Sequence, residues 1–588
     1  MKIKHGQFLG DVIESLETNS IYHKKLTSIG ATTLELSTKR HSIILEPNVP
    51  VIIGKKSKSI LGVHEGVGVD RVVEYLLFNK VKHKKILVTP ESFYKVKEAV
   101  KLSKMNLYED FFLLFDECDR IIKDIEFRNS ILLPMDDFFK FKNKAFISAT
   151  AIRPSDPLFD KHDFKDVLIL PDFDFKKDLE LITTNNVQLS LKKILREVES
   201  ENYCIFLNST KLIGSYVKKL ELLNESAIFC SKKATYNFKI AKFKNTHEHL
   251  KDFKKYNFFT SRFFSAVDIY MDTPPVVIMI SEIKTSPHSM IDPFTDAVQI
   301  VGRFRKGVGR VIHITNLDDS LEAMTKDEVF AYLNGCETSY NQIKSLRNGA
   351  TNNGAKDTLN EALRLVPFAN YLNEDGTKNF YMQDYTVHDE KVKHCYINSK
   401  NLIDALGIEH FKVNHKEEKY PLDDLGNKKL SSGLSLQNIV TEIVKTLDWA
   451  LTNLEEFTLD NRNEVLIELN KYWPFIVHAY KELGSELLLK NSYSMKQIIK
   501  TLKRKKQTGY KSNFEFIEAL NDELLGETAP TFELLSKFGN IICDYDLDLR
   551  PSLKSLSEYF KLSKRKTLRW TAGVEMKGYT VLKSHFTQ

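Results

Sequence analysis

The 588-residue chain has few cysteines, and the six that it contains lie far apart with no paired spacing. That pattern supports neither a disulfide framework nor a structural zinc site. No apolar run approaches the length of a membrane span, and the first residues, Met1–Gln7, are too polar for a signal peptide. We therefore expect a protein of the reducing cytoplasm with no membrane partner.

The chain also lacks a strong excess of charge of one sign. Its formal net charge is +7, with lysine and arginine spread along the whole sequence. This is mild support for a polyanionic partner such as a nucleic acid. There is no convincing internal repeat and no low-complexity tract, and the length exceeds what one hydrophobic core serves, so several domains are expected.

The most informative stretch is Phe112–Asp119, in which four apolar residues lead directly into Asp116-Glu117-Cys118-Asp119. An apolar run of this kind predicts a strand buried on both faces of a parallel sheet. Carboxylates at its carboxyl end are costly to bury without a partner. The usual partner is a nucleotide-bound magnesium ion, held by the Asp while the Glu orients water. An acidic strand end capped by a loop is the alternative.

Alternating strand and helix patterns surround this stretch from about residue 10 to 315, which predicts parallel sheets wrapped by helices. The pattern is interrupted near Val167–Asp174 and then resumes. The strands expected before this break are Ser42–Glu46, Ile60–Val63, Lys85–Thr89, Phe112–Asp116 and Ala145–Ser148. Those expected after it are Leu179–Thr183, Cys204–Leu207, Ala227–Cys230, Asn257–Thr260, Val276–Ile280 and Val311–Thr315.

Three further motifs follow the acidic stretch in a fixed order. The strand pattern Lys144–Thr150 ends in Ser148-Ala149-Thr150, and Phe258–Ile269 contains Thr260-Ser261 and then Asp268. Gln299–Lys306 reads Gln-Ile-Val-Gly-Arg-Phe-Arg-Lys. Each motif alone is weak, but their order and spacing resemble the motif set of superfamily 2 helicases of the DEAD/DEAH type over roughly residues 20 to 315.

The resemblance implies an α/β fold with two RecA-like parallel-sheet domains and a mainly α-helical C-terminal region. The corresponding boundaries are residues 1–170, 171–320 and 321–545, followed by a basic module at 546–588. ATP and Mg²⁺ would bind between the first two domains, at the carboxyl ends of the strands. Long helical patterns such as Ser435–Leu451 and Asn463–Glu482 support the helical region, while Asn348–Asp357 and Asp423–Ser432 have the composition of loops.

The resemblance also implies roles for individual residues. Asp116 would hold magnesium and Glu117 would polarise the attacking water. Arg303, with Arg305 or Lys306, would reach the γ-phosphate from the second domain, and Gln299 would orient the water or the phosphate. The residues that would couple the nucleotide site to the nucleic acid are Ser148, Thr150, Thr260, Ser261 and Asp268.

A phosphate-binding loop with the sequence Gly-x-x-x-x-Gly-Lys-Ser/Thr is absent. The favoured substitute is the segment Ser28–Thr33, where Ser28 replaces the first glycine, Gly30 is kept and Ala31 replaces the lysine. Thr32 keeps the magnesium-binding hydroxyl and is followed by Thr33. Lys24 or Lys25, just upstream, could supply the missing cation.

A second candidate for this loop is Glu65–Arg71, which has a better glycine pair, Gly66 and Gly68. It carries Asp70 in place of the hydroxyl, and a carboxylate there would repel phosphate. We interpret it as a turn between a strand and a helix. The Leu26–Leu36 segment, followed by Ser42–Pro50, resembles a variant loop of helicase-like proteins from Bacteroides-group phages and mobile elements.

The last residues contain a helical pattern, a basic stretch from Lys561 to Trp570, a turn at Ala572-Gly573 and a short strand, Gly578–Leu582. A helix followed by a basic two-stranded wing, as in a winged helix, is one way to grip a duplex. The alternative is a solvated basic tail, and the residues leave both open.

The sequence thus predicts an ATP-dependent nucleic-acid helicase or translocase. DNA is favoured over RNA, phage or mobile-element replication proteins are the expected partners, and a bacterial host would be the setting if the gene is phage-borne. The alternative is a helicase-like scaffold that binds nucleic acid without hydrolysing ATP, which the replacement of the loop lysine by Ala31 favours.

Overall fold

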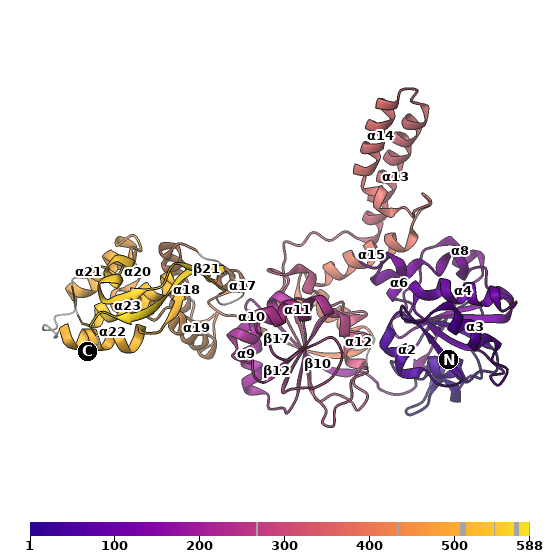
Figure 1. Cartoon of the computed structure of the whole chain (residues 1–588), viewed down its shortest axis with the longest axis horizontal. Helices are drawn as coiled ribbons and strands as arrows, with labels where there is room; N and C mark the ends of the chain where they lie inside the picture. The colour runs from indigo at the N-terminus through magenta and orange to yellow at the C-terminus, as the bar shows by residue number, and fades with distance from the viewer. Residues whose placement is uncertain are drawn as a thin grey trace.

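The computed structural model describes residues 1–265, 268–431, 434–505, 513–545, 547, 549–569 and 575–586, with side chains omitted at 503–505 and 513–514. The turn expected at Ala572-Gly573 lies outside the described residues. Two α/β units lie side by side, followed by a third, mainly helical unit (Figure 1). Among the described helices, none combines the length and the apolar character that a membrane crossing requires.

The first unit is built on a seven-stranded parallel sheet with strand order β4-β5-β3-β6-β7-β2-β8. The apolar residues of its central strands β5, β3, β6 and β7 are almost fully buried because helices cover both faces. The strands are β2 (Ser20–His23), β3 (His41–Leu45), β4 (Ile60–Val63), β5 (Lys85–Val88), β6 (Phe111–Asp116), β7 (Asn143–Ser148) and β8 (Lys165–Leu168). The main helices are α1 (Ala31–Ser37), α2 (Val49–Lys55), α3 (Val69–Leu77), α4 (Phe93–Leu102), α6 (Arg120–Lys123) and α8 (Pro157–Lys161).

The second unit contains an eight-stranded parallel sheet with strand order β13-β12-β14-β11-β15-β16-β10-β17. Its strands are β10 (Lys177–Thr184), β11 (Tyr203–Phe206), β12 (Ser226–Phe229), β13 (Thr246–His247), β14 (Tyr256–Phe259), β15 (Val276–Ser281), β16 (Val311–Thr315) and β17 (Phe411–Glu418). Its helices include α9 (Val187–Glu197), α10 (Thr210–Lys219), α11 (Lys232–Ile240), α12 (Asp296–Gly302) and α16 (Ser399–Gly407). The two parallel sheets confirm the expected fold class.

The second sheet takes its edge strand β17 from well beyond residue 320, the expected end of this domain. Between β16 and β17 the chain forms a helical hairpin, α13 (Lys326–Gly349) and α14 (Asn353–Leu365), which projects from the body (Figure 1). The expected loop at Asn348–Asp357 is therefore wrong in large part, because only a short turn separates the two helices.

Helix α15 (Phe380–Cys395) follows the hairpin and joins the two α/β units. Tyr381, near its start, belongs to the core of the first unit, whereas Val392 and Cys395, near its end, belong to the core of the second. Asp384 accepts a hydrogen bond from the backbone N–H of Ser155 (2.7 Å). The helix therefore acts as a strut across the junction.

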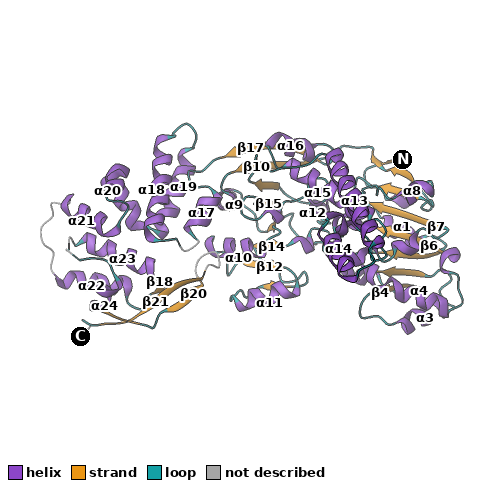
Figure 2. Cartoon of the chain, turned by 90° about the horizontal axis from the view of Figure 1, so that it is seen from above, coloured by secondary structure: helices purple, strands orange, loops and turns teal. Residues whose placement is uncertain are grey.

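The third unit is helical with a small antiparallel sheet, in which β21 pairs with β18, β19 and β20 (Figure 2). Its helices are α17 (Asp424–Leu430), α18 (Leu436–Thr452), α19 (Leu459–Tyr472), α20 (Pro474–Lys490), α21 (Met495–Lys505), α22 (Asn513–Leu524), α23 (Thr531–Asp544) and α24 (Leu553–Tyr559). Its strands are β18 (Thr528–Pro530), β19 (Phe560–Leu562), β20 (Lys566–Arg569) and β21 (Glu575–Ser584). Helix α17 occupies most of the loop expected at Asp423–Ser432, which was wrong.

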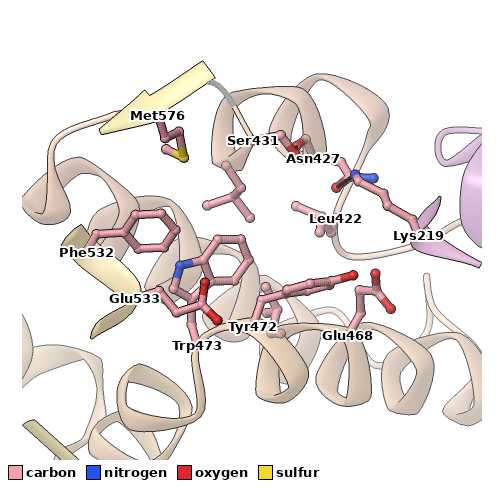
Figure 3. Close-up of a pocket in the computed structure, with 12 residues that line it drawn as sticks. Lys219, Leu422, Asn427, Ser431, Glu468, Tyr472, Trp473, Phe532, Glu533 and Met576 are labelled. Carbon is pink, nitrogen blue, oxygen red and sulfur yellow. Dashed lines mark hydrogen bonds between the residues drawn. The ribbon is translucent and has the colours of Figure 1, made fainter. Parts of the chain in front are cut away.

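The second and third units contact each other through ion pairs and through side chains around a small cavity. Glu464 of α19 pairs with Lys192 of α9 (3.2 Å) and with Arg196. A cavity of about 20 Å³, enough for one water molecule, lies between Lys219, Glu468, Trp473 and Glu533 (Figure 3). This cavity is too small for a ligand larger than a water molecule.

Candidate functional site

The acidic motif lies where the sequence predicts, at the carboxyl end of the buried central strand β6. Asp116 is buried, and one of its oxygens accepts the backbone N–H of Glu117 (3.0 Å). Glu117 adopts a left-handed backbone conformation (φ +50°), which is uncommon for a residue with a side chain. Such local strain is often found at functional sites.

The favoured phosphate loop lies beside this motif. Thr32, near the start of α1, donates its hydroxyl to Asp116 Oδ2 (2.5 Å). Gly30 occupies a left-handed conformation (φ +78°), and Ser28 is exposed with φ +65°. Ala31 is buried, whereas Thr33 is exposed on α1. By contrast, the Glu65–Arg71 segment forms the end of the turn after β4 and the first residues of α3.

Lys24 supplies a positive charge that the motif alone does not contain. Its ammonium lies 3.5 Å from Asp116 Oδ1 and 3.9 Å from Glu117 Oε1. Burial opposes ionisation of both Lys24 and Asp116. The mutual attraction of the two groups outweighs this effect of burial. Glu117 adds to the attraction on Lys24, and Lys55 adds to that on Asp116. The pKa of Lys24 is therefore raised and that of Asp116 is lowered.

The second α/β unit contributes two side chains to the same place, one from Gln299 in α12 and one from Arg303, which directly follows α12. The side-chain amide Nε2 of Gln299 donates hydrogen bonds to Glu117 Oε2 (2.9 Å) and to Thr150 Oγ1 (3.2 Å). Arg303 donates to Gln299 Oε1, and its guanidinium lies 3.9 Å from Glu117 Oε1. Among the described residues, buried Arg303 Nε has no hydrogen-bond partner, so this guanidinium retains a donor for a further acceptor.

The Ser-Ala-Thr motif connects to the acidic motif through Asp119. The hydroxyl of Ser148 donates to Asp119 (2.5 Å), with Glu117 Oε2 at 3.2 Å, and Thr150 donates to the other Asp119 oxygen (3.1 Å). Burial and the charge of Glu117 raise the pKa of Asp119. The role of Asp119 as an anchor for both hydroxyls was missed from the sequence, although its place in the motif was visible.

Close packing across the junction keeps these groups together. Half-buried Lys123 of α6 pairs with Asp292 (3.1 Å) and with Asp296 of α12. A Cβ atom built on Gly302 would lie 2.4 Å from side-chain atoms of Thr27, so only glycine fits against the loop there. The glycine of the Gln-x-x-Gly-Arg motif thus serves a close approach between the two units.

The remaining candidates lie away from the acidic pair. Arg305 forms an ion pair with Asp268 (2.6 Å), and Lys306 pairs with Asp272 (2.9 Å), so neither reaches Glu117 as Arg303 does. Thr260 and Ser261 follow strand β14; Thr260 is buried and Ser261 is exposed. Arg305 instead lines a cavity of about 240 Å³ next to Thr27 and Ser28.

Glu46, at the carboxyl end of β3, is a buried acid that the sequence analysis did not single out. Its Oε1 has no hydrogen-bond partner among the described residues. Burial, reinforced by the charges of Asp116 and Glu117, raises the pKa of Glu46 to about 8. A lone glutamate after an apolar strand carries no sequence signal that would separate it from a surface residue.

Comparisons with known proteins give a distant likeness of structure only. No protein-family model matches the chain, and no curated protein matches its sequence. Dbp5 from S. cerevisiae bound to RNA and ADP BeF3 aligns with 13% identity and a TM-score of 0.34, covering 51% of this chain and 79% of that one. DEAD-box helicase Mss116 bound to ssRNA and UDP-BeF aligns with 12% identity and a TM-score of 0.37, covering 80% and 84%.

Helicase Lhr of Mycobacterium smegmatis, bound to ssDNA and AMP-PNP, aligns with 10% identity and a TM-score of 0.33, covering 51% of this chain and 44% of that one. The nucleic acids and nucleotides belong to those structures. The narrower resemblance to phage and mobile-element proteins finds no counterpart among sequence relatives. Each of these three likenesses is weak and concerns the fold alone.

Proposed function

We propose that the chain is an ATP-dependent nucleic-acid helicase or translocase. The observation that carries the proposal is the position of Glu117, which is bonded to Gln299 from the other α/β unit and lies 3.9 Å from Arg303. A ligand that changes the charge beside Glu117 would alter a contact between the two units. That coupling is what a nucleotide-driven motor requires.

The residues at the junction fit a magnesium nucleotide. Magnesium commonly takes one or two protein ligands and completes its shell with water and phosphate oxygens, and adjacent Thr32 and Asp116 provide such a pair. Magnesium would supply charge neutralisation of the phosphates. Glu117 would hold and polarise the attacking water, Gln299 would orient Glu117, and the unpartnered Nε–H of Arg303 would bind the terminal phosphate.

The nucleic acid would lie across both α/β units, with phosphate contacts dominating. The basic strands β19 to β21 would add contacts from the third unit, since Lys561 in β19, Lys564 between β19 and β20, and Lys583 in β21 are exposed. The preference for DNA and the role in phage or mobile-element replication rest on the sequence resemblance. Both DNA and RNA therefore belong in the first assay.

A second candidate function is a scaffold that binds nucleic acid and nucleotide without turnover. Ala31, which is buried where the phosphate loop of related enzymes has lysine, favours it. The contacts among Glu117, Gln299 and Arg303 favour the enzyme, because a scaffold does not need a carboxylate positioned by a neighbouring domain.

The deciding experiment measures ATP turnover by the purified full-length protein, alone and with single-stranded DNA or single-stranded RNA of equal length. The proposal expects magnesium-dependent turnover that one of the two nucleic acids stimulates. Matched samples of Glu117→Gln control for a contaminating ATPase. Binding of ATP and nucleic acid without turnover above that control would establish the scaffold instead, and no binding of ATP would refute both.

A further inference from the structure

Lys24 lies in the first α/β unit where three strand ends meet. It directly follows β2, and its backbone N–H donates to the carbonyl of Ser148 at the end of β7 (2.9 Å). Asp116 ends β6, the next strand of the sheet. The side chain is 7% exposed, and its ammonium faces both carboxylates of the acidic pair.

The adjacent lysine has a different environment. Lys25 turns away from the acidic pair and binds Glu409 (2.5 Å). Lys55 acts on Asp116 at longer range, and Arg303, which directly follows α12, approaches Glu117 from the second unit. Among the described residues, Lys24 is the cation of the first unit that forms an ion pair with Asp116.

This ion pair is incompatible with a divalent cation in the same position. A magnesium ion held by Asp116 would repel an ammonium a few ångströms away, at short range and in a poorly solvated site. The same event would bring phosphate oxygens beside Thr32. A lysine side chain has a flexible four-carbon stem, so its ammonium can exchange one anionic partner for another without a change of backbone.

We propose that Lys24 replaces the lysine missing at position 31. Without nucleotide it neutralises Asp116 and Glu117, and with magnesium nucleotide its ammonium moves to the terminal phosphates. This inference rests on the proposed function and adds to it a cation from the strand that precedes the loop. It also implies that divalent metal alone competes with Lys24 and binds weakly until nucleotide is present.

The test compares full-length wild type with Lys24→Met in titrations with Mg-ATP, Mg-ADP and Mn²⁺ alone. Loss of one charge-assisted contact predicts ATP binding weaker by about 10- to 100-fold, with a smaller loss for ADP. Binding of Mn²⁺ alone should strengthen, because the ammonium no longer competes. The matched control is Lys144→Met, an equally buried lysine at the other end of β7 whose ammonium donates to the Phe141 carbonyl (3.0 Å).

A second variant separates phosphate binding from a purely structural ion pair. Lys24→Met/Ala31→Lys returns an ammonium to the loop and should recover most of the lost ATP affinity. If Lys24→Met does not fold, Lys24→Arg replaces it: its larger, planar head should weaken ATP binding, and Ala31→Lys should again compensate.

Unchanged ATP affinity in a folded Lys24→Met protein would overturn the inference while leaving the proposed function intact. Failure of Ala31→Lys to compensate would overturn it as well. Absence of ATP binding by the wild type would instead refute the proposed function itself.

Discussion

Gly302→Ala is expected to separate the two α/β units. The new methyl carbon would lie 2.4 Å from Thr27 Oγ1 and Cγ2 and 2.7 Å from Thr27 Cβ, well inside van der Waals contact. Overpacking of this kind costs about 1–3 kcal/mol, whereas alanine in place of glycine in a helix returns at most about 1 kcal/mol. Since Gly302 is the last residue of α12, the gain is smaller still, so the clash prevails.

The cost is expected to appear as opening of the junction, because the contact joins two separately folded units. The distance between fluorophores on α3 and α11, in nucleotide-free protein, should increase and broaden relative to wild type. Thr27→Gly removes all three clashing atoms, so Thr27→Gly/Gly302→Ala should restore the wild-type distance. If the Gly302→Ala protein has the same fluorophore distance as wild type, the reasoning is refuted. It is also refuted if the double variant keeps the longer distance.

Three further predictions concern turnover, pH and salt. Glu117→Gln should lower ATP turnover by about 10²–10⁴-fold while ATP binding persists, because only general-base action is lost; equal turnover would remove Glu117 from that role. Glu46 has a folded pKa of about 8, above the usual value of 4.5, so the folded state retains a proton that the unfolded state releases. Stability should therefore fall as pH rises from about 4.5 to about 8, and Glu46→Gln should flatten this dependence in thermal unfolding scans at pH 5 and pH 8. A Glu46→Gln profile parallel to that of wild type would argue against it. Finally, Lys561→Ala/Lys564→Ala/Lys583→Ala should weaken nucleic-acid binding and reduce the log–log salt slope by about 0.7–0.9 per lost phosphate contact; an identical slope would leave the module as a solvated end.

Alanine substitutions test the C-terminal module more cleanly than its removal would, for a structural reason. Strand β21 pairs with β18, and Phe560 and Val581 belong to the same core as α23. Truncation before residue 550 would uncover that core. Loss of binding by a truncated protein would therefore report unfolding as well as lost charge.

Most strands of the two parallel sheets were predictable because they are short, continuous apolar runs bounded by polar residues. Strands β2, β8 and β13 were not predicted, because they are short and contain few consecutive apolar residues. Strand β17 was not predictable in this way: Phe411–Glu418 contains Lys-Val-Asn-His-Lys-Glu-Glu after its first residue, and most of its side chains are exposed. It lies at the edge of the sheet, where charged residues are common since one side has no neighbouring strand. Its partner β10 is about 230 residues away, beyond the reach of local patterns.

Helix breaks were also harder to place than helices. The helix expected over Asn463–Glu482 is divided at Trp473, because Pro474 favours the first position of a helix and cannot continue one. In the site, the motif resemblance paired Thr32 with Asp116, and the structure brings the start of α1 beside the end of β6, where the two side chains are hydrogen-bonded. The sequence could not show whether Arg303 or Arg305 reaches Glu117, since the directions of the two side chains depend on where α12 ends against the loop at Thr27.

Helix α15 couples the projecting hairpin to the angle between the two α/β units. With 24 residues at 1.5 Å each, α13 is about 36 Å long, and it contacts α15 near its base. Because the two ends of α15 are fixed in different cores, a change in the angle between the α/β units must tilt this helix. A tilt of 10° at the base displaces the hairpin tip by about 6 Å, so small movements at the junction are amplified at a distant point of the surface.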